Sequence, residues 1–196
     1  MNMKQKLKFW AARFGRNEDG GTVAIEFVMM VPLLAWAFLS TITYFHAYRT
    51  EAIAHKAGLT IADMISREAD YITPQYLSGA RSLLRFLTLD DKYPDIRITV
   101  AYWDAGENKY KRAWSKERGP RSPLTQSEVA ALHTKLPILT DQERVVIVET
   151  WTEYEARYAV GQDDFDMSTF TAISPRFVDR ICWNATPDQG ADTEQC

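Results

Sequence analysis

One long apolar run dominates the hydrophobic pattern near the start of the chain. It extends from Thr22 to Phe45, and its 24 residues include no Lys, Arg, Asp or His. A helix of this length, at about 1.5 Å per residue, covers about 36 Å, and a hydrocarbon core is about 30 Å thick. We therefore predict a transmembrane helix over residues 22–45.

The helical pattern continues beyond the apolar run. Between Ala47 and Glu68 there is no Pro, and Gly58 is the one glycine. Apolar residues near helical spacing give this segment one buried face: Ala52, Ile53, Ala57, Ile61, Met64 and Ile65. We expect the opposite face, with its charged side chains, to be solvated. The pattern predicts a stem helix to about residue 68, loosened or kinked at Pro32 because proline removes a backbone hydrogen bond.

The remaining pattern predicts a mixed head domain over residues 69–196. We expect a second helix over 75–87, strands over 96–103, 109–115, 144–158 and 167–173, and a short helix from Thr125 or Ser127 to about His133. The strand over 96–103 alternates apolar and polar residues, which is typical of a half-buried strand. The predicted fold class is α+β, with an antiparallel sheet packed on the stem and helices.

Basic residues gather before the apolar run. Residues 1–21 contain five cations against Glu18 and Asp19: Lys4, Lys6, Lys8, Arg13 and Arg16. Short flanks rich in Lys and Arg stay in the cytoplasm, so we expect the helix to run with its N-terminus inside and the head outside.

Glu26 is the one charge inside the apolar run. A carboxylate costs about 2.5–3.5 kcal/mol at the bilayer centre and less near a helix end. One interpretation is positional: Glu26 lies one turn inside the helix, where it would reach the headgroups and favour the positive end of the helix dipole. The other interpretation considers Glu26 together with the basic leader, the two glycines and the apolar run that surround it in sequence.

The order of the parts resembles a prepilin. The basic leader ends in Gly20-Gly21, and a cut after Gly21 would make Thr22 the first residue of the mature chain and Glu26 the fifth. An ordinary secretory signal has a shorter basic region and is cut after its apolar run. The sequence GGTVAIEF over residues 20–27, followed by VPLL over 31–34, resembles the TadE/TadG group of pseudopilins of the tight-adherence (Tad) pilus system. Residues 173–177 and 181–183 are also similar to chains of this group.

The resemblance implies a minor pilin or pseudopilin that takes part in assembly of a Tad (Flp-type IVb) pilus, in adhesion or surface attachment. It implies cleavage between Gly21 and Thr22 by a prepilin peptidase, and assembly contacts at Glu26, Phe27 and Pro32. The expected partners are other pilin or pseudopilin subunits and the pilus assembly platform. The expected location is the bacterial inner membrane, single-pass, with the N-terminus cytoplasmic and the C-terminal domain periplasmic. In a bundle of subunits, Glu26 would pair with the freed amine of Thr22 on a neighbour.

The alternative is an uncleaved, single-span, membrane-anchored periplasmic protein whose outer domain serves as a binding module or scaffold. The N-terminus of the mature chain separates these two hypotheses. We expect no enzymatic activity and no cofactor, because the sequence has no nucleophile elbow, P-loop, Rossmann glycine pattern or zinc-protease motif. With 23 Lys and Arg against 26 Asp and Glu and no basic patch beyond the leader, we also expect no nucleic-acid partner.

Cys182 and Cys196 are the only cysteines, and both lie in the part predicted to face outside. An oxidising compartment suits a disulfide between them, and two free thiols are the alternative. Metal sites are not expected. Asp163, Asp164 and Asp166 have oxygen ligands that suit Ca²⁺, but they lack a full twelve-residue ligand pattern, so a solvated acidic loop is the expectation. Aromatic residues on the predicted strands would serve core packing or a partner surface.

Overall fold

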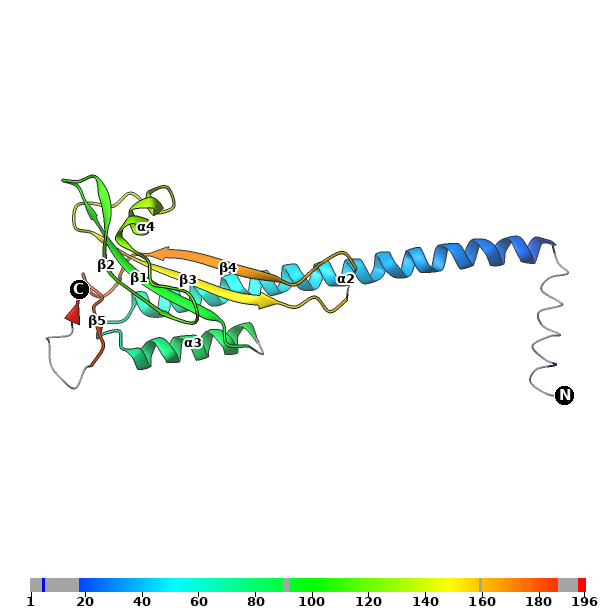
Figure 1. The fold of residues 1–196 in the computed structure, drawn as a ribbon, viewed down its shortest axis with the longest axis horizontal. Coiled ribbons are helices and arrows are strands. Elements are labelled where there is room, and N and C mark those ends of the chain that lie inside the picture. Colours follow the sequence, from blue (N-terminus) through cyan, green and yellow to red (C-terminus); the bar gives the residue numbers. More distant parts are fainter. Residues whose placement is uncertain (1–4, 6–17, 90–91, 159, 187–193) are drawn as a thin grey trace. The chain divides into compact units, whose positions relative to one another are not determined.

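The structure, a computed structural model, describes residue 5 and residues 18–89, 92–158, 160–186 and 194–196. The fold is mixed α+β, as predicted (Figure 1). Its helices are α2 (Glu18–Ser66), α3 (Pro74–Thr88), α4 (Gln126–Ala131) and the 3-10 helix η1 (Leu132–Thr134). Its strands are β1 (Asp95–Asp104), β2 (Lys109–Arg118), β3 (Arg144–Tyr154), β4 (Phe165–Ile173), β5 (Trp183–Asn184) and β6 (Glu194–Gln195).

The chain divides into two compact units. The first, here the helix unit, contains Met1–His46 and Ala156–Asp163. The second, here the sheet unit, contains Ala47–Glu155 and Asp164–Cys196. α2 contributes its first part to the helix unit and its last 20 residues, from Ala47, to the sheet unit.

Four strands form one antiparallel sheet in the order β2-β1-β3-β4. The β1–β2 connection is a tight hairpin. Asn108 takes the left-handed conformation with a φ of 50°, and the Glu107 amide donates to the Asp104 carboxylate at 3.0 Å. Asn and Asp favour such turns because they tolerate left-handed φ and accept local hydrogen bonds. β2 runs further than predicted, to Arg118, and β3 ends earlier, at Tyr154.

The central strands are buried on both faces, so the prediction of a half-buried strand is wrong for the middle of β1. Ile96, Ile98 and Val100 lie in the core with α2 and α3, whereas Ala101 lies in a second apolar cluster with Val145 and Ile147 of β3. The segment between β2 and β3 closes that second cluster with Leu124, Val129, Leu136 and Leu139. The alternation read from the sequence did not reveal this cover, because small or hydroxyl side chains such as Ala101 fit either environment.

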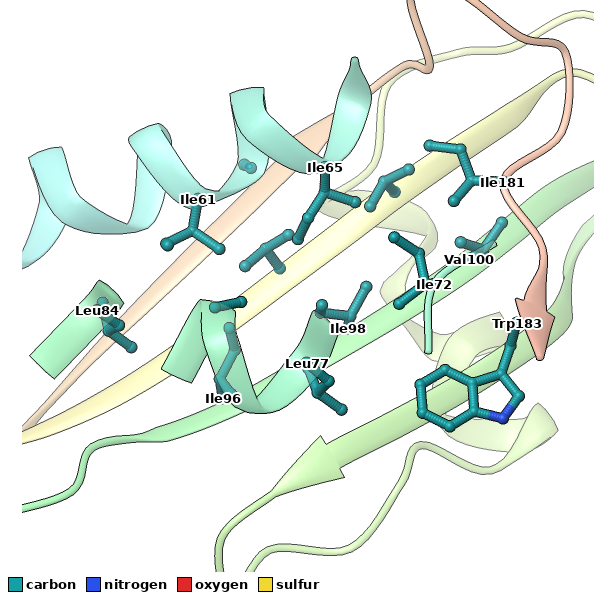
Figure 2. Packing of buried hydrophobic residues seen from close by; sticks show 14 of the residues in the cluster. Ile61, Ile65, Ile72, Leu77, Leu84, Ile96, Ile98, Val100, Ile181 and Trp183 are labelled. Atoms are coloured by element: carbon teal, nitrogen blue, oxygen red, sulfur yellow. The ribbon is translucent and has the colours of Figure 1, made fainter. Parts of the chain in front are cut away.

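α2 packs its last turns on the sheet through small and branched residues (Figure 2). Ala54, Ala57, Ile61, Ala62 and Ile65 are buried, whereas Ala52, predicted to face the core, is exposed. Most of these buried residues follow one another at intervals of three or four, the spacing that keeps one helix face toward the sheet. The helix ends at Ser66, close to the predicted end.

α3 lies in the same core and begins with a strong cap. The Thr73 hydroxyl accepts a hydrogen bond from the Tyr76 amide at 3.1 Å, and Pro74 occupies the first helical turn, where its missing N–H costs nothing. Leu77, Ala80 and Leu84 are buried at about one-turn spacing in the core with β1 and α2, and Figure 2 labels Leu77 and Leu84 there.

Candidate functional site

The first part of α2 is long and apolar enough to cross a membrane. Large apolar side chains are exposed along it, from Val23 at 64% to Phe38 at 66%. Such a surface is rare on a protein surrounded by water, where exposed apolar patches mark contact with a membrane or another protein. Among the described residues this is the one helix with that combination of length and composition.

The residues of the predicted cleavage site lie within α2. Gly21 and Thr22 have helical backbone, continuous with Glu18 at the start of the helix. The basic leader that the processing hypothesis needs, residues 1–17, lies outside the described residues apart from Gln5. Cleavage at this site therefore stays a prediction.

Glu26 and Phe27 project from α2 into open space. Both side chains are exposed, Phe27 at 68%, and Glu26 makes no ion pair or hydrogen bond with any side chain from residue 23 onward that the structure describes. The carboxylate thus lies within an exposed apolar surface, one turn from the start of the apolar run. An ionised group in that position is costly in lipid unless it reaches the headgroups or a partner.

Pro32 lies inside α2, and the helix continues through it. Because proline has no amide hydrogen, the carbonyl of Val28 loses its usual intrahelical donor. Further along, hydroxyl groups are satisfied within the helix: Thr41 donates to the Ala37 carbonyl and Thr43 to the Leu39 carbonyl, each at 2.9 Å. Internal satisfaction of this kind suits a helix in hydrocarbon.

The structure brings the two cysteines together. The sulfur atoms of Cys182 and Cys196 are 2.12 Å apart and their Cα atoms 4.5 Å apart, a separation within the range of disulfides. The Arg144 guanidinium donates to the Cys196 carbonyl, which ties this end of the chain to β3. The predicted pairing is therefore geometrically satisfied.

The segment before Cys182 is anchored by backbone and indole hydrogen bonds. The Trp114 indole donates to the Ile181 carbonyl at 2.8 Å, and the Ile72 amide donates to the Cys182 carbonyl at 2.9 Å. Trp183 packs on Trp114, with ring centroids 5.9 Å apart. A disulfide at Cys182 is thus held against the main core by these contacts of residues 181–183.

The acidic loop before β4 forms no metal site in the part of the chain that the structure describes, where no group of three His, Cys, Asp or Glu side chains converges. Asp166 lies 3.4 Å from Arg121, an ion pair on the surface. Of the histidines, His133 packs beside Trp103 and Tyr110.

Most aromatic residues on the strands serve packing. Tyr110, Trp114 and Tyr154 are buried. Trp151 is half-buried and carries two guanidinium groups over its ring, with Arg121 at 4.4 Å and Arg97 at 5.0 Å from the centroid. These contacts account for Tyr110, Trp114, Tyr154 and Trp151 by packing inside the unit, and a partner surface on the remaining strand aromatics stays a prediction.

Sequence reasoning missed two polar contacts that shape the sheet. Arg97 pairs with Glu149 across β1 and β3 at 2.7 Å, and both side chains are mostly buried. The Gln126 amide caps the free edge of β2, accepting from the Arg112 amide at 2.8 Å and donating to the Tyr110 carbonyl at 2.9 Å. Opposite charges at facing strand positions would have suggested the first contact, but no local sequence signal indicates the second.

Ion pairs alter the ionisation of surface groups in the sheet unit. The Lys92 ammonium donates to Glu153 and Glu155, which raises its pKa above the usual range. Burial raises the pKa of Tyr76 to about 12.

Comparison of the chain with protein-family models, curated proteins and solved structures gives no match.

Proposed function

We propose that the protein is a membrane-inserted, pilin-like subunit that takes part in assembly of a Tad-type pilus. The proposal extends the sequence resemblance of residues 20–27 and 31–34 to the TadE/TadG pseudopilins. In this role a prepilin peptidase removes residues 1–21 at the inner membrane, and the partners are other pilin subunits and the assembly platform. The sheet unit lies on the periplasmic side, and the role is structural rather than catalytic.

The observation that supports the proposal best is the construction of α2. One continuous helix of 49 residues has an exposed apolar part that carries Glu26 and a final part packed into the sheet unit. A plain anchor needs only about 20 apolar residues and no charge. A helix that is apolar in its first part and packed into the sheet unit in its last part has a further use. It lets a subunit leave the bilayer and pack its apolar part against other subunits without refolding its sheet.

Glu26 acquires a function in such a bundle. In lipid its charge is unfavourable, but beside a cationic group of a neighbour it is stabilised, and more so where water is excluded. The amine of Thr22, freed by cleavage, is a suitable partner because it lies one turn away along the helix and neighbouring helices would be staggered. Phe27 and the weakened hydrogen bonding at Pro32 would help the helix adapt to its neighbours.

Substitution of Glu26 tests the proposal. Glu26→Gln keeps the size of the side chain and removes its charge, and Glu26→Ala removes both. Membrane insertion should be unchanged or easier in both variants, because a charge leaves an apolar helix. Pilus production and crosslinking to other pilins should fall together in both. Glu51→Gln, an exposed glutamate of the same helix in the sheet unit, is the matched control and should leave assembly intact.

Normal pilus assembly with both Glu26 variants would contradict the proposal. The protein would then be better described as an uncleaved, single-span anchor that carries a periplasmic binding or scaffold unit.

A further inference from the structure

The loop between β3 and β4 covers part of the apolar run. Residues 156–158 and 160–163 belong to the same compact unit as α2 up to His46, and Figure 1 shows them beside α2. On α2, Ser40 is only 9% exposed and Thr43 only 1%, although the large side chains from Val23 to Phe38 are exposed. Apart from Gln5, this loop is the only described part of the unit outside α2. We therefore assign the burial of Ser40 and Thr43 to the loop.

The positions of Ser40 and Thr43 along the apolar run indicate how deep in the membrane the loop lies. The inference rests on the proposed membrane anchoring of α2. The apolar run of about 36 Å exceeds a hydrocarbon core of about 30 Å by about four residues. With the inner boundary near Thr22, the outer boundary falls near Ser40 to Thr43. A loop that lies on these residues is at the level of the lipid headgroups.

We propose that this loop binds phospholipid headgroups of the outer leaflet through Arg157 and Tyr158. Both side chains are exposed, Tyr158 at 40%, and Arg157 makes no hydrogen bond or ion pair with the residues that the structure describes. A guanidinium group matches phosphate oxygens in a two-bond geometry. Tyrosine prefers the boundary between hydrocarbon and water, because its ring is apolar and its hydroxyl polar.

The helix itself carries matching residues at this level. Tyr44, Phe45 and Tyr48 are exposed on α2, at 43%, 70% and 70%. Aromatic residues of this kind form belts at membrane boundaries. The loop therefore adds a phosphate-binding cation to an aromatic belt that is continuous with the membrane-spanning segment.

Acidic residues near the loop determine whether the loop needs an anionic lipid for binding. Asp163 is exposed, and Glu155 shares the single Lys92 ammonium with Glu153, each at 2.8 Å. The loop has no excess of positive charge, so attraction to an anionic bilayer is not what holds it. The contact is made by one guanidinium and one phosphate, and a bilayer of zwitterionic phosphatidylcholine should support it.

The experiment uses the full chain in phosphatidylcholine nanodiscs. A ketone-bearing residue, p-acetylphenylalanine, at position 158 carries a nitroxide, which leaves the cysteines untouched. The ratio of oxygen to nickel-complex accessibility reports the depth of the label. References are the same label at Phe38, in the exposed apolar part of α2, and at Ile138, fully exposed between η1 and β3. We expect the ratio at position 158 to fall between those two references.

The outcomes separate the loop contact from the anchoring itself. A label at Phe38 that is as accessible to nickel as the label at Ile138 would overturn the membrane anchoring. A buried Phe38 label with an aqueous label at 158 would overturn the loop contact alone. Arg157→Glu should shift the label at 158 toward water, whereas the same change at the exposed Arg180 should not. An unchanged depth in Arg157→Glu would overturn the phosphate contact.

Discussion

Gly58 is a single position where the structure demands the smallest residue. An added Cβ would lie 2.7 Å from the Thr169 hydroxyl, closer than real Cβ contacts. Thr169 cannot turn away without loss, because its hydroxyl pairs with that of Thr150 at 2.6 Å inside the core. The glycine therefore allows α2 to approach β4 closely, in spite of its cost in a helix.

Gly58→Val should destabilise the sheet unit by about 1–3 kcal/mol, because overpacking forces the threonine pair apart. Gly79→Ala is the matched control, since Gly79 lies in α3 with nothing near its absent side chain. That change should stabilise the protein by about 0.5–1 kcal/mol through helix propensity. Urea unfolding of the two variants measures both effects, and equal stability of Gly58→Val and the parent would contradict the close approach.

Asp104 and Glu107 make the β1–β2 hairpin sensitive to acid. The Lys111 ammonium and the Glu107 amide lower the pKa of Asp104, and Lys109 and Lys111 lower that of Glu107. Because these pKa values are lower in the folded state, the stabilisation is present above the unfolded values of about 4 and is lost as the pH falls through the folded values.

Asp104→Asn should therefore lower the Tm near neutral pH, and the difference from the parent should shrink as the pH falls below about 4. Thermal unfolding at a series of pH values measures this. Asp163→Asn removes a carboxylate that makes no ion pair with the described residues, and its Tm difference should not change with pH in this way. A constant difference for Asp104→Asn across the range would refute the linkage.

At the scale of elements, the end of the chain is fastened to the core by Cys182 and Cys196. The two residues are 14 apart in sequence. A bond that closes a loop of this size is worth about 3 kcal/mol in the chain-entropy model. Ile181 and Trp183, on either side of Cys182, both reach Trp114, so this loop is coupled to the main core.

Reduction of the protein, or the double change Cys182→Ser with Cys196→Ser, should lower the stability by about 3 kcal/mol. Non-reducing peptide mapping of protein from native membranes should find the two cysteines in one linked pair. The double variant should be insensitive to reductant, which is the control. Two free thiols in periplasmic protein would rule the bond out.

The elements themselves were largely predictable from the sequence, because their signals are local. The predicted helices begin at residue 75 and at Thr125 or Ser127, and the structure starts α3 at Pro74 and α4 at Gln126, after the caps Thr73 and Thr125. Alternation located β1, and the long apolar run located α2. The second covered face of the sheet was not predictable, because it depends on residues 119–143 folding back, a contact between segments without a periodic signal. The edge cap by Gln126 was missed for the same reason.

The candidate site was predictable only in part. Exposure of the apolar part of α2 agrees with the composition of residues 22–45. The burial of Ser40 and Thr43 could not be foreseen, because we assign it to a loop more than 100 residues further along the chain. No residue pattern in that loop identifies what it covers.

At the scale of the whole molecule, the position of the mature N-terminus decides between a pilin-like subunit and a plain anchor. We expect the mature chain to begin at Thr22, because Gly21 lies between a basic leader and an apolar helix. Gly21→Leu should block the cut, since a protease that approaches the backbone closely needs a residue without a side chain. Intact-mass measurement on protein from native membranes gives the answer directly.

Gly20→Leu is the matched control for that variant, because it adds the same side chain one residue before the predicted cut. It should be processed, although more slowly if the enzyme also contacts that position. Reporter fusions after Arg49 should at the same time place the sheet unit outside the inner membrane, because the cations lie before the apolar run. A parent chain that keeps residues 1–16 while the peptidase is present would show that Thr22 has no free amine. Glu26 would then lose its proposed partner, and its charge would be explained by its position near the membrane surface alone.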